Sequence, residues 1–204
     1  KKEDAPLIEK QVPVIENGRM TPEILWAFGR VGNVEVSPDE TKILYSVSYY
    51  SVEQNKSNSE LFVMNTDGSG KKQITKTANK EIAAKWMNDS KHIAFLSNES
   101  GSMQLWTMKD DGTARTRLTD REGDISDFSF SPDERKVLLV ADVKYGKRTA
   151  DIHPDLPKAS GVIVNDLMYK HWDEWVQTVP HPFVAPFAGN KVGEATDILA
   201  GEPY

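Results

Sequence analysis

Two adjacent acids, Asp173 and Glu174, are the residues of this 204-residue chain best suited to binding chemistry. They stand between Trp172 and Trp175. A carboxylate beside an apolar wall binds an ammonium group through a charge-assisted hydrogen bond, and more strongly than in open water. The pair is therefore a candidate cation-binding site, although acids on an exposed helix more often serve solubility.

The other chemistry-bearing patterns predict turns and loops. His153, His171 and His181 lie near acids but lack the H-x-x-x-H spacing of a helical zinc site, so we expect solvated loop histidines. Loops 65–70 and 110–112 lack the late bidentate Glu of a calcium loop and are expected to be turns. We expect no metal and no cofactor.

Catalytic nucleophiles are also missing from these patterns. The chain has no cysteine and no G-x-S-x-G segment, which excludes thiolate chemistry and the nucleophile elbow of an α/β-hydrolase. We therefore assign no catalytic residue and expect the chain alone to be inactive.

Composition indicates a globular chain with ordinary partners. Its 25 basic and 31 acidic residues give a net charge of −6, and no basic cluster is present, so we expect neither nucleic acid nor a membrane surface as partner. No apolar run reaches the roughly 18 residues of a membrane helix. The start at Lys1 lacks the apolar stretch of a signal peptide, which an exported form would have lost.

The elements that must position the acids follow from an internal repeat. Three segments share one pattern of two apolar runs around a turn, and its Asp falls at Asp39, Asp89 and Asp133. The first two repeats continue into a second pair of runs around Gly68 and Gly112. The first repeat also carries six extra residues between Ser48 and Glu60, at a hairpin tip. Turns are predicted at Pro38-Asp39, Asp67-Gly68, Asp89-Ser90, Asp111-Gly112 and Pro132-Asp133.

Each repeat of about 45 residues thus predicts four antiparallel strands, which is the size of one β-propeller blade. A plain β-sandwich would not repeat its turns in register. We predict an all-β fold, a partial β-propeller of four-stranded antiparallel blades, packed face to face through Val36, Trp86 and Phe130. Trp26, Trp86 and Trp106 are expected to pack between blades.

The predicted organisation has four parts. An N-terminal segment, 1–32, leads into blade repeats at 33–78, 79–123 and 124–204, and the chain ends at the start of a further blade. The third repeat is interrupted between its middle strands by an insertion at about 143–180, longer than a hairpin loop needs. Its second half, with Asn165 and apolar residues at 168, 172, 175 and 176, predicts a short amphipathic helix.

These features resemble a known family. The segment Met20-Thr21-Pro22-Glu23, the Ser-Pro-Asp and Asp-Gly blade turns, and the insertion from Met168 to Trp175 are similar to the N-terminal propeller of bacterial prolyl oligopeptidase family serine peptidases. The resemblance is to the branch of the dipeptidyl peptidase V and acylaminoacyl peptidases, and it covers nearly the whole chain.

The resemblance implies a propeller that gates and orients short peptides for a C-terminal α/β-hydrolase domain. It also implies a periplasmic or secreted enzyme, and a cytoplasmic location stays open. It also implies that Glu174 and Asp173 hold the free amine of the substrate. The alternative is a periplasmic, protein-binding propeller of the TolB kind without catalysis. In either case an open blade edge is expected to favour self-association.

Overall fold

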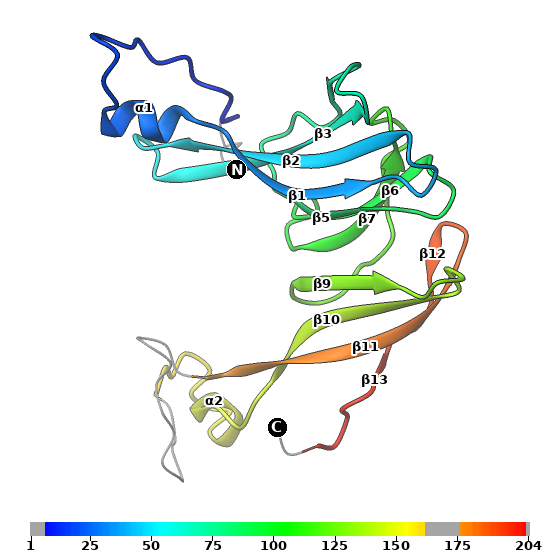
Figure 1. The fold of residues 1–204 in the computed structure, drawn as a ribbon. Coiled ribbons are helices and arrows are strands. Elements are labelled where there is room, and N and C mark those ends of the chain that lie inside the picture. The colour runs from blue at the N-terminus through cyan, green and yellow to red at the C-terminus, as the bar shows by residue number, and fades with distance from the viewer. Residues whose placement is uncertain (1–6, 162–175, 203–204) are drawn as a thin grey trace.

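The computed structural model describes residues 7–161 and 176–202, which form three antiparallel β-sheets with two short helices in these ranges. The sheets follow one another along the chain and stack as layers (Figure 1). Among the described residues no helix combines the length and apolarity needed to cross a membrane.

Each sheet is a meander of consecutive strands. The orders are β1-β2-β3-β4, β5-β6-β7-β8 and β9-β10-β11-β12, and β13 also pairs with β11. The strands are β1 (Arg30–Val36), β2 (Lys42–Ser51), β3 (Lys56–Asn65), β4 (Lys72–Gln73), β5 (Glu81–Trp86), β6 (His92–Ser97), β7 (Gln104–Lys109), β8 (Thr116–Arg117), β9 (Ile125–Phe130), β10 (Lys136–Lys144), β11 (Thr178–Ala188), β12 (Lys191–Val192) and β13 (Thr196–Asp197).

In the first turn of each blade, an Asp carboxylate accepts hydrogen bonds from other groups of the turn. In the turn between β9 and β10, the Asp133 carboxylate accepts hydrogen bonds from the Ser131 hydroxyl at 2.6 Å and from the Arg135 N–H at 3.1 Å. Asp39 does the same for Ser37 and Thr41. Such Asx turns explain why the predicted positions of these turns are confirmed.

The hydrophobic core lies between the sheets in two layers. The first joins sheet β1–β4 to sheet β5–β8 through Leu44, Leu61 and Trp86, among others. The second joins sheet β5–β8 to sheet β9–β12 through Leu96, Leu105 and the third sheet's apolar face. The middle sheet is therefore buried on both faces, and the outer two on one face each.

Strand register shows why one packing prediction is wrong. Val36 pairs with Ile43, Trp86 with Ile93 and Phe130 with Val137, so the three occupy one repeat position. At this position the side chain faces the preceding blade. Trp86 and Phe130 pack there as predicted, but Val36 is 54% exposed because no blade precedes the first one in the structure.

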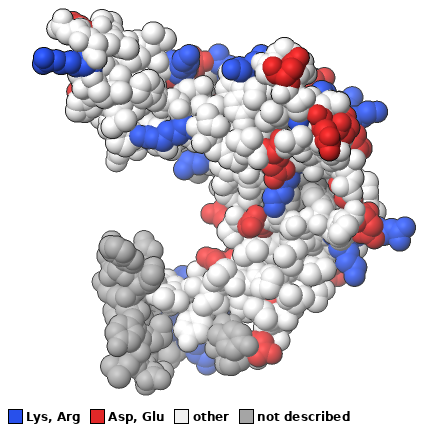
Figure 2. All heavy atoms as spheres, viewed as in Figure 1, with Lys and Arg blue, Asp and Glu red and all other residues white. Residues whose placement is uncertain are grey.

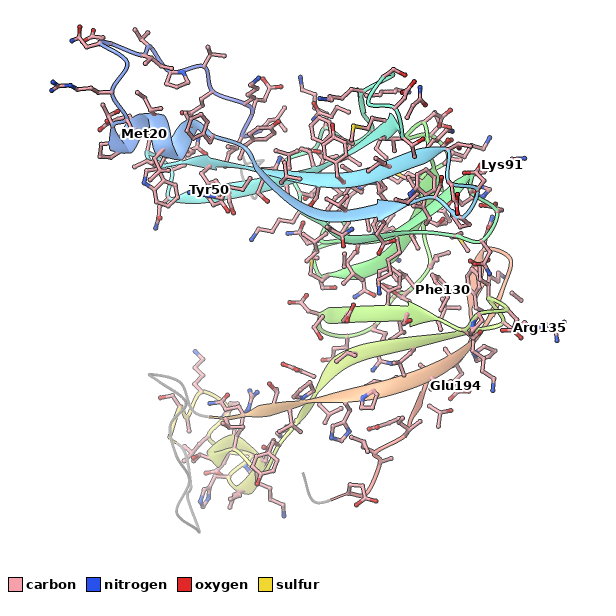
Figure 3. The ribbon with its side chains drawn as sticks, in the orientation of Figure 1. Met20, Tyr50, Lys91, Phe130, Arg135 and Glu194 are labelled. Atoms are coloured by element: carbon pink, nitrogen blue, oxygen red, sulfur yellow. The ribbon has the colours of Figure 1, made fainter. Side chains whose placement is uncertain are left out.

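The six extra residues of the first repeat lengthen its central hairpin. Strands β2 and β3 pair over ten residues each, from Lys42 opposite Asn65 to Ser51 opposite Lys56. The short helix α1 (Pro22–Ala27) contacts β2, and Figure 3 shows its neighbour Met20 at the same end of the hairpin as Tyr50.

Helix α1 was not expected from the repeat pattern, although its start carries a clear signal. Thr21 caps it through a hydrogen bond from the Ile24 N–H to the hydroxyl, and Pro22 occupies the first helical position. The helix places Trp26 outside the sheets, so Trp26 is 42% exposed and the prediction that it packs between blades is wrong.

The insertion of the third repeat is narrower than predicted. Strands β10 and β11 pair as far as Lys144 opposite Thr178, which extends the sheet beyond the expected limits of 143 and 180. The short helix α2 (Thr149–Ile152) lies in the polar first half of the insertion. The helix predicted around Asn165 to Trp175 lies outside the described residues.

Candidate functional site

The candidate acids Asp173 and Glu174, with His171, lie outside the described residues, but the strands that carry their segment are defined. That segment joins the end of β10 to the start of β11, the same connection that forms the β2–β3 hairpin tip in the first blade. In Figure 1 helix α1 beside the β2–β3 hairpin and helix α2 after β10 lie at the same side of the stacked sheets. Figure 2 shows the described surface around these ends of the sheets, with basic side chains near the hairpin side.

A pocket of about 380 Å³ opens at the β2–β3 hairpin tip. Its apolar surface comes from Trp26, Tyr50 and Val52, and its polar surface from the hairpin turn: Ser51, Asn55, Lys56 and Ser57. The Trp26 and Tyr50 rings meet edge to face with centroids 5.5 Å apart. Repeat counting could not find this pocket, because the helix that supplies Trp26 precedes the first repeat.

Arg30 holds the two aromatic rings together. Its guanidinium lies 4.8 Å from the centroid of the Trp26 ring and 4.2 Å from that of Tyr50. Both are cation–π distances, at which a guanidinium stabilises the orientation of the rings it contacts. The pocket wall is thus fixed by three side chains from α1, β1 and β2.

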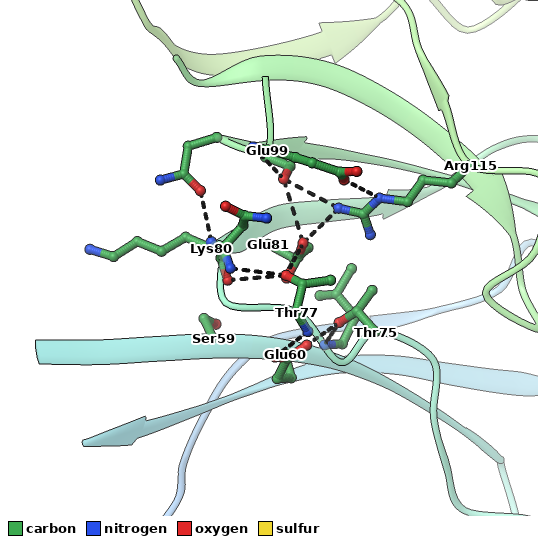
Figure 4. Close-up of polar contacts among 12 residues, drawn as sticks. Ser59, Glu60, Thr75, Thr77, Lys80, Glu81, Glu99 and Arg115 are labelled. Carbon is green, nitrogen blue, oxygen red and sulfur yellow. Dashed lines mark hydrogen bonds and ion pairs between the residues drawn. The ribbon is translucent and has the colours of Figure 1, made fainter. Parts of the chain in front are cut away.

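Two buried carboxylates with raised pKa values, Glu60 and Glu81, belong to neighbouring blades (Figure 4). Glu60 on β3 accepts hydrogen bonds from the Thr75 hydroxyl at 2.7 Å, the Thr77 N–H at 3.0 Å and the Asn58 amide at 2.7 Å. Burial raises the pKa of Glu60, and these hydrogen bonds oppose the rise.

Glu81 on β5 is fully buried and faces Arg115. The guanidinium donates a hydrogen bond to the Glu81 carboxylate at 2.6 Å and another to Glu99 at 2.7 Å. Burial raises the pKa of Glu81 to about 7, even though the Arg115 hydrogen bond and charge lower it. Perturbed carboxylates often mark active sites, but Glu81 has no exposed surface from which to reach a substrate. The cluster therefore acts as a structural joint between blades.

Glu60 occupies a repeat position that is polar in all three blades. Glu60 pairs with Val47, Gln104 with Ser97 and His181 with Ala141, which are equivalent register positions. Gln104 accepts hydrogen bonds from the Thr119 hydroxyl and the Arg121 N–H, as Glu60 does from Thr75 and Thr77.

His181 shows that one sequence prediction is wrong. It was expected in a solvated loop, but it lies in β11 with 6% exposure, and its Nδ1 is 2.9 Å from the Asp197 carboxylate. Its register position places it inside the sheet stack. His153, by contrast, is exposed at the end of α2. In the described ranges no group of three or more His, Asp or Glu residues is arranged to hold a metal ion.

Comparison with known proteins decides the family. The model of the TolB beta propeller domain matches residues 26–160, which is more than half of the chain. The chain belongs to the TolB β-propeller domain family. The predicted propeller fold is therefore confirmed.

The chain is also similar to peptidases and to a Tol-Pal system protein. The chain is 54% identical over 185 residues to dipeptidyl-peptidase 5 of Porphyromonas gingivalis, covering 91% of this chain and 27% of that protein. It is 32% identical over 91 residues to the Tol-Pal system protein TolB of Francisella tularensis, which covers 44% of this chain and 21% of that protein. The acylaminoacyl peptidase of Pyrococcus horikoshii has the same fold, with a TM-score of 0.61 and 17% identity over 85% of this chain and 25% of that one.

The inferred resemblance to the propeller part of prolyl oligopeptidase-type peptidases is thus confirmed. The chain spans about a quarter of the length of the dipeptidyl-peptidase relative it matches.

Proposed function

We propose that this chain is the N-terminal propeller part of a serine exopeptidase, which gates and orients short peptides for a C-terminal α/β-hydrolase domain. The observation that carries the proposal is the 54% identity to a dipeptidyl-peptidase over 91% of the chain. A stack of blades can close off a reaction chamber to folded proteins and admit short chains, which fits a propeller to which we assign no catalytic residue.

The test measures peptidase activity of the full-length protein on short peptides and on a folded protein. We expect it to release dipeptides or acylated residues from short peptides, to react with a serine-directed fluorophosphonate, and to leave a folded protein substrate uncut. A full-length protein that shows no peptidase activity and no fluorophosphonate labelling contradicts the proposal. It would favour the second candidate, a protein-binding propeller, which the TolB similarity over 44% of the chain supports.

Within this function, we propose that Glu174 and Asp173 bind the free amine of the substrate. Their segment connects β10 to β11 at the rim, where an insertion can reach a cavity shared with a second domain. Loss of a charge-assisted hydrogen bond costs on the order of 1.5 to 3 kcal/mol, so Glu174→Gln and Asp173→Asn should lower kcat/KM about ten- to a hundredfold on a free dipeptide substrate.

The same substitutions should spare the N-acetylated form of that substrate. Asp155→Asn, an exposed acid elsewhere in the insertion, is the control and should leave both substrates unaffected. Equal kinetics of wild type, Glu174→Gln and Asp173→Asn on the free substrate would return both acids to the solvated surface.

The uncovered face of the first blade suggests a further packing partner. Val31, Val34 and Val36 are 64%, 61% and 54% exposed on it. The equivalent faces of the next two blades are each covered by the blade before them, so a further four-stranded blade of the longer protein is the partner that fits. Self-association of the isolated chain would use the same face. Because its relatives include a dipeptidyl-peptidase 5 and a Tol-Pal system protein TolB, we also propose a periplasmic or secreted location.

A further inference from the structure

The pocket at the β2–β3 hairpin tip has the size and lining of a small ligand site. Its volume of about 380 Å³ is within the range of small-molecule pockets and is enough for one or two amino-acid residues. Two aromatic rings, Trp26 and Tyr50, make one wall, while amide, hydroxyl and ammonium groups of the turn make the other. Such a mixture suits a ligand with one apolar and one polar end.

The positive charges at the pocket favour a ligand whose polar end is an anion. Lys56 lines the pocket, and the Arg30 guanidinium lies within cation–π distance of two of its wall residues, Trp26 and Tyr50. Neither cation forms an ion pair with a carboxylate of the described residues. A lysine ammonium in the lining donates a charge-assisted hydrogen bond to an anionic acceptor such as a carboxylate.

The backbone of the turn supports this selectivity. Asn55 adopts a φ of 49°, and its N–H bonds to the Val52 carbonyl, which closes the turn and fixes the start of β3 at Lys56. The Lys56 ammonium therefore extends from a defined point of a hairpin rather than from a loose loop. The aromatic wall is fixed in turn by the edge-to-face contact of Trp26 with Tyr50.

We propose that this pocket binds a peptide carboxylate with an adjacent apolar side chain, the carboxylate at Lys56 and the side chain on Trp26 and Tyr50. This rests on the proposed function in taking a peptide as ligand. Arg30 acts as a positioning residue for the rings.

The experiment uses the full-length protein and small probes that offer no scissile peptide bond between two residues. Calorimetric titration compares N-acetyl-phenylalanine, its amide, and N-acetyl-glutamic acid α-amide. We expect the first to bind about tenfold more tightly than the amide, since the amide loses a charge-assisted contact. Preference for the third probe over the amide would assign the site to an acidic side chain instead of a peptide C-terminus.

The variants separate the site from general charge effects. Lys56→Gln should remove the preference for acid over amide, while Lys80→Gln, an exposed lysine of the β4–β5 connection, should keep it. Arg30→Lys retains the charge but loses the guanidinium contacts with the Trp26 and Tyr50 rings, so it should weaken binding of both phenylalanine probes. Equal binding of acid and amide by the wild type, or an unchanged preference in Lys56→Gln, overturns the proposal. Calorimetry measures binding without turnover. The pocket proposal can therefore fail while peptidase activity is found, and the peptidase proposal can fail while the pocket binds the probes.

Discussion

Glu60 and Glu81, buried carboxylates from neighbouring blades, are joined by one residue, Thr77. The Thr77 N–H donates to Glu60 at 3.0 Å, and its hydroxyl donates to Glu81 at 3.0 Å. Thr77 lies in the connection between β4 and β5, so the link from one blade to the next is held by both acids (Figure 4). The joint between the first two blades therefore depends on the ionisation of buried groups.

Stability should fall as the pH rises from about 4.5 to about 7. The folded pKa of Glu81 is raised to about 7 from an ordinary 4.5, so between these values the folded state keeps a proton that the unfolded state releases. This difference amounts to on the order of 3 kcal/mol, complete above the folded pKa. Thermal melts of the chain at pH 5, 6, 7 and 8 measure it.

Glu81→Gln should flatten most of that pH dependence, and the raised pKa of Glu60 accounts for a remainder of the same sign. Glu99→Gln is the matched control, because Glu99 contacts the same Arg115 from an exposed position and should leave the slope intact. A wild-type stability that is constant or rises over this pH range contradicts the assigned role of Glu81.

Glu60→Gln should be tolerated, whereas Glu60→Leu should not. Gln104 makes the corresponding hydrogen bonds in the second blade, so an amide is compatible with this repeat position. Leucine leaves Thr75 and the Thr77 N–H without a buried acceptor, which costs about 1–3 kcal/mol. Urea unfolding of the two variants measures the difference, and equal losses of stability would show that the hydrogen bonds are unimportant.

Gly112→Ala should destabilise the protein more than Gly68→Ala. The two glycines occupy equivalent turns with φ of 88° and 85°, so both substitutions carry a backbone cost of about 1 kcal/mol. Only at Gly112 would the new Cβ lie 2.3 Å from the Ile74 carbonyl oxygen of the preceding blade. Comparing the melting temperatures isolates this contact, and indistinguishable values would refute it.

Trp86→Ala should cost about 3–5 kcal/mol, as expected for a large buried side chain. Val36→Ala, at the equivalent position of the first blade, should change the stability of the isolated chain by less than about 0.5 kcal/mol because Val36 is exposed. In a longer protein with a further blade, Val36→Asp should become clearly destabilising. A neutral effect there would argue against that blade covering this face.

The sequence was sufficient for the parts of the fold that local chemistry determines. Turns at Asp39 and Asp133 are built by side chains next to them in the chain, so their spacing revealed the blades. Exposure at Val36 depends on which blade comes before it, and burial of His181 on its register with Ala141. Those relationships are not local, which is why both predictions were wrong.

The candidate site was predictable only in part for the same reason. The insertion between β10 and β11 was visible as an interruption of the repeat, whereas the pocket needs Trp26 from α1 beside Tyr50 from β2. Thr21 and Pro22 indicated a helix start, but nothing in the spacing indicated where that helix would pack.

The burial of the middle sheet on both faces has a consequence for motion. Amide protons of β6 and β7 should exchange with solvent most slowly, since opening them requires both core layers to separate. The first and third blades each lose only one layer on opening, and they carry the aromatic pocket and the insertion. The two segments proposed to bind a peptide thus belong to the blades that separate at the lowest free energy, while the middle blade between them opens last.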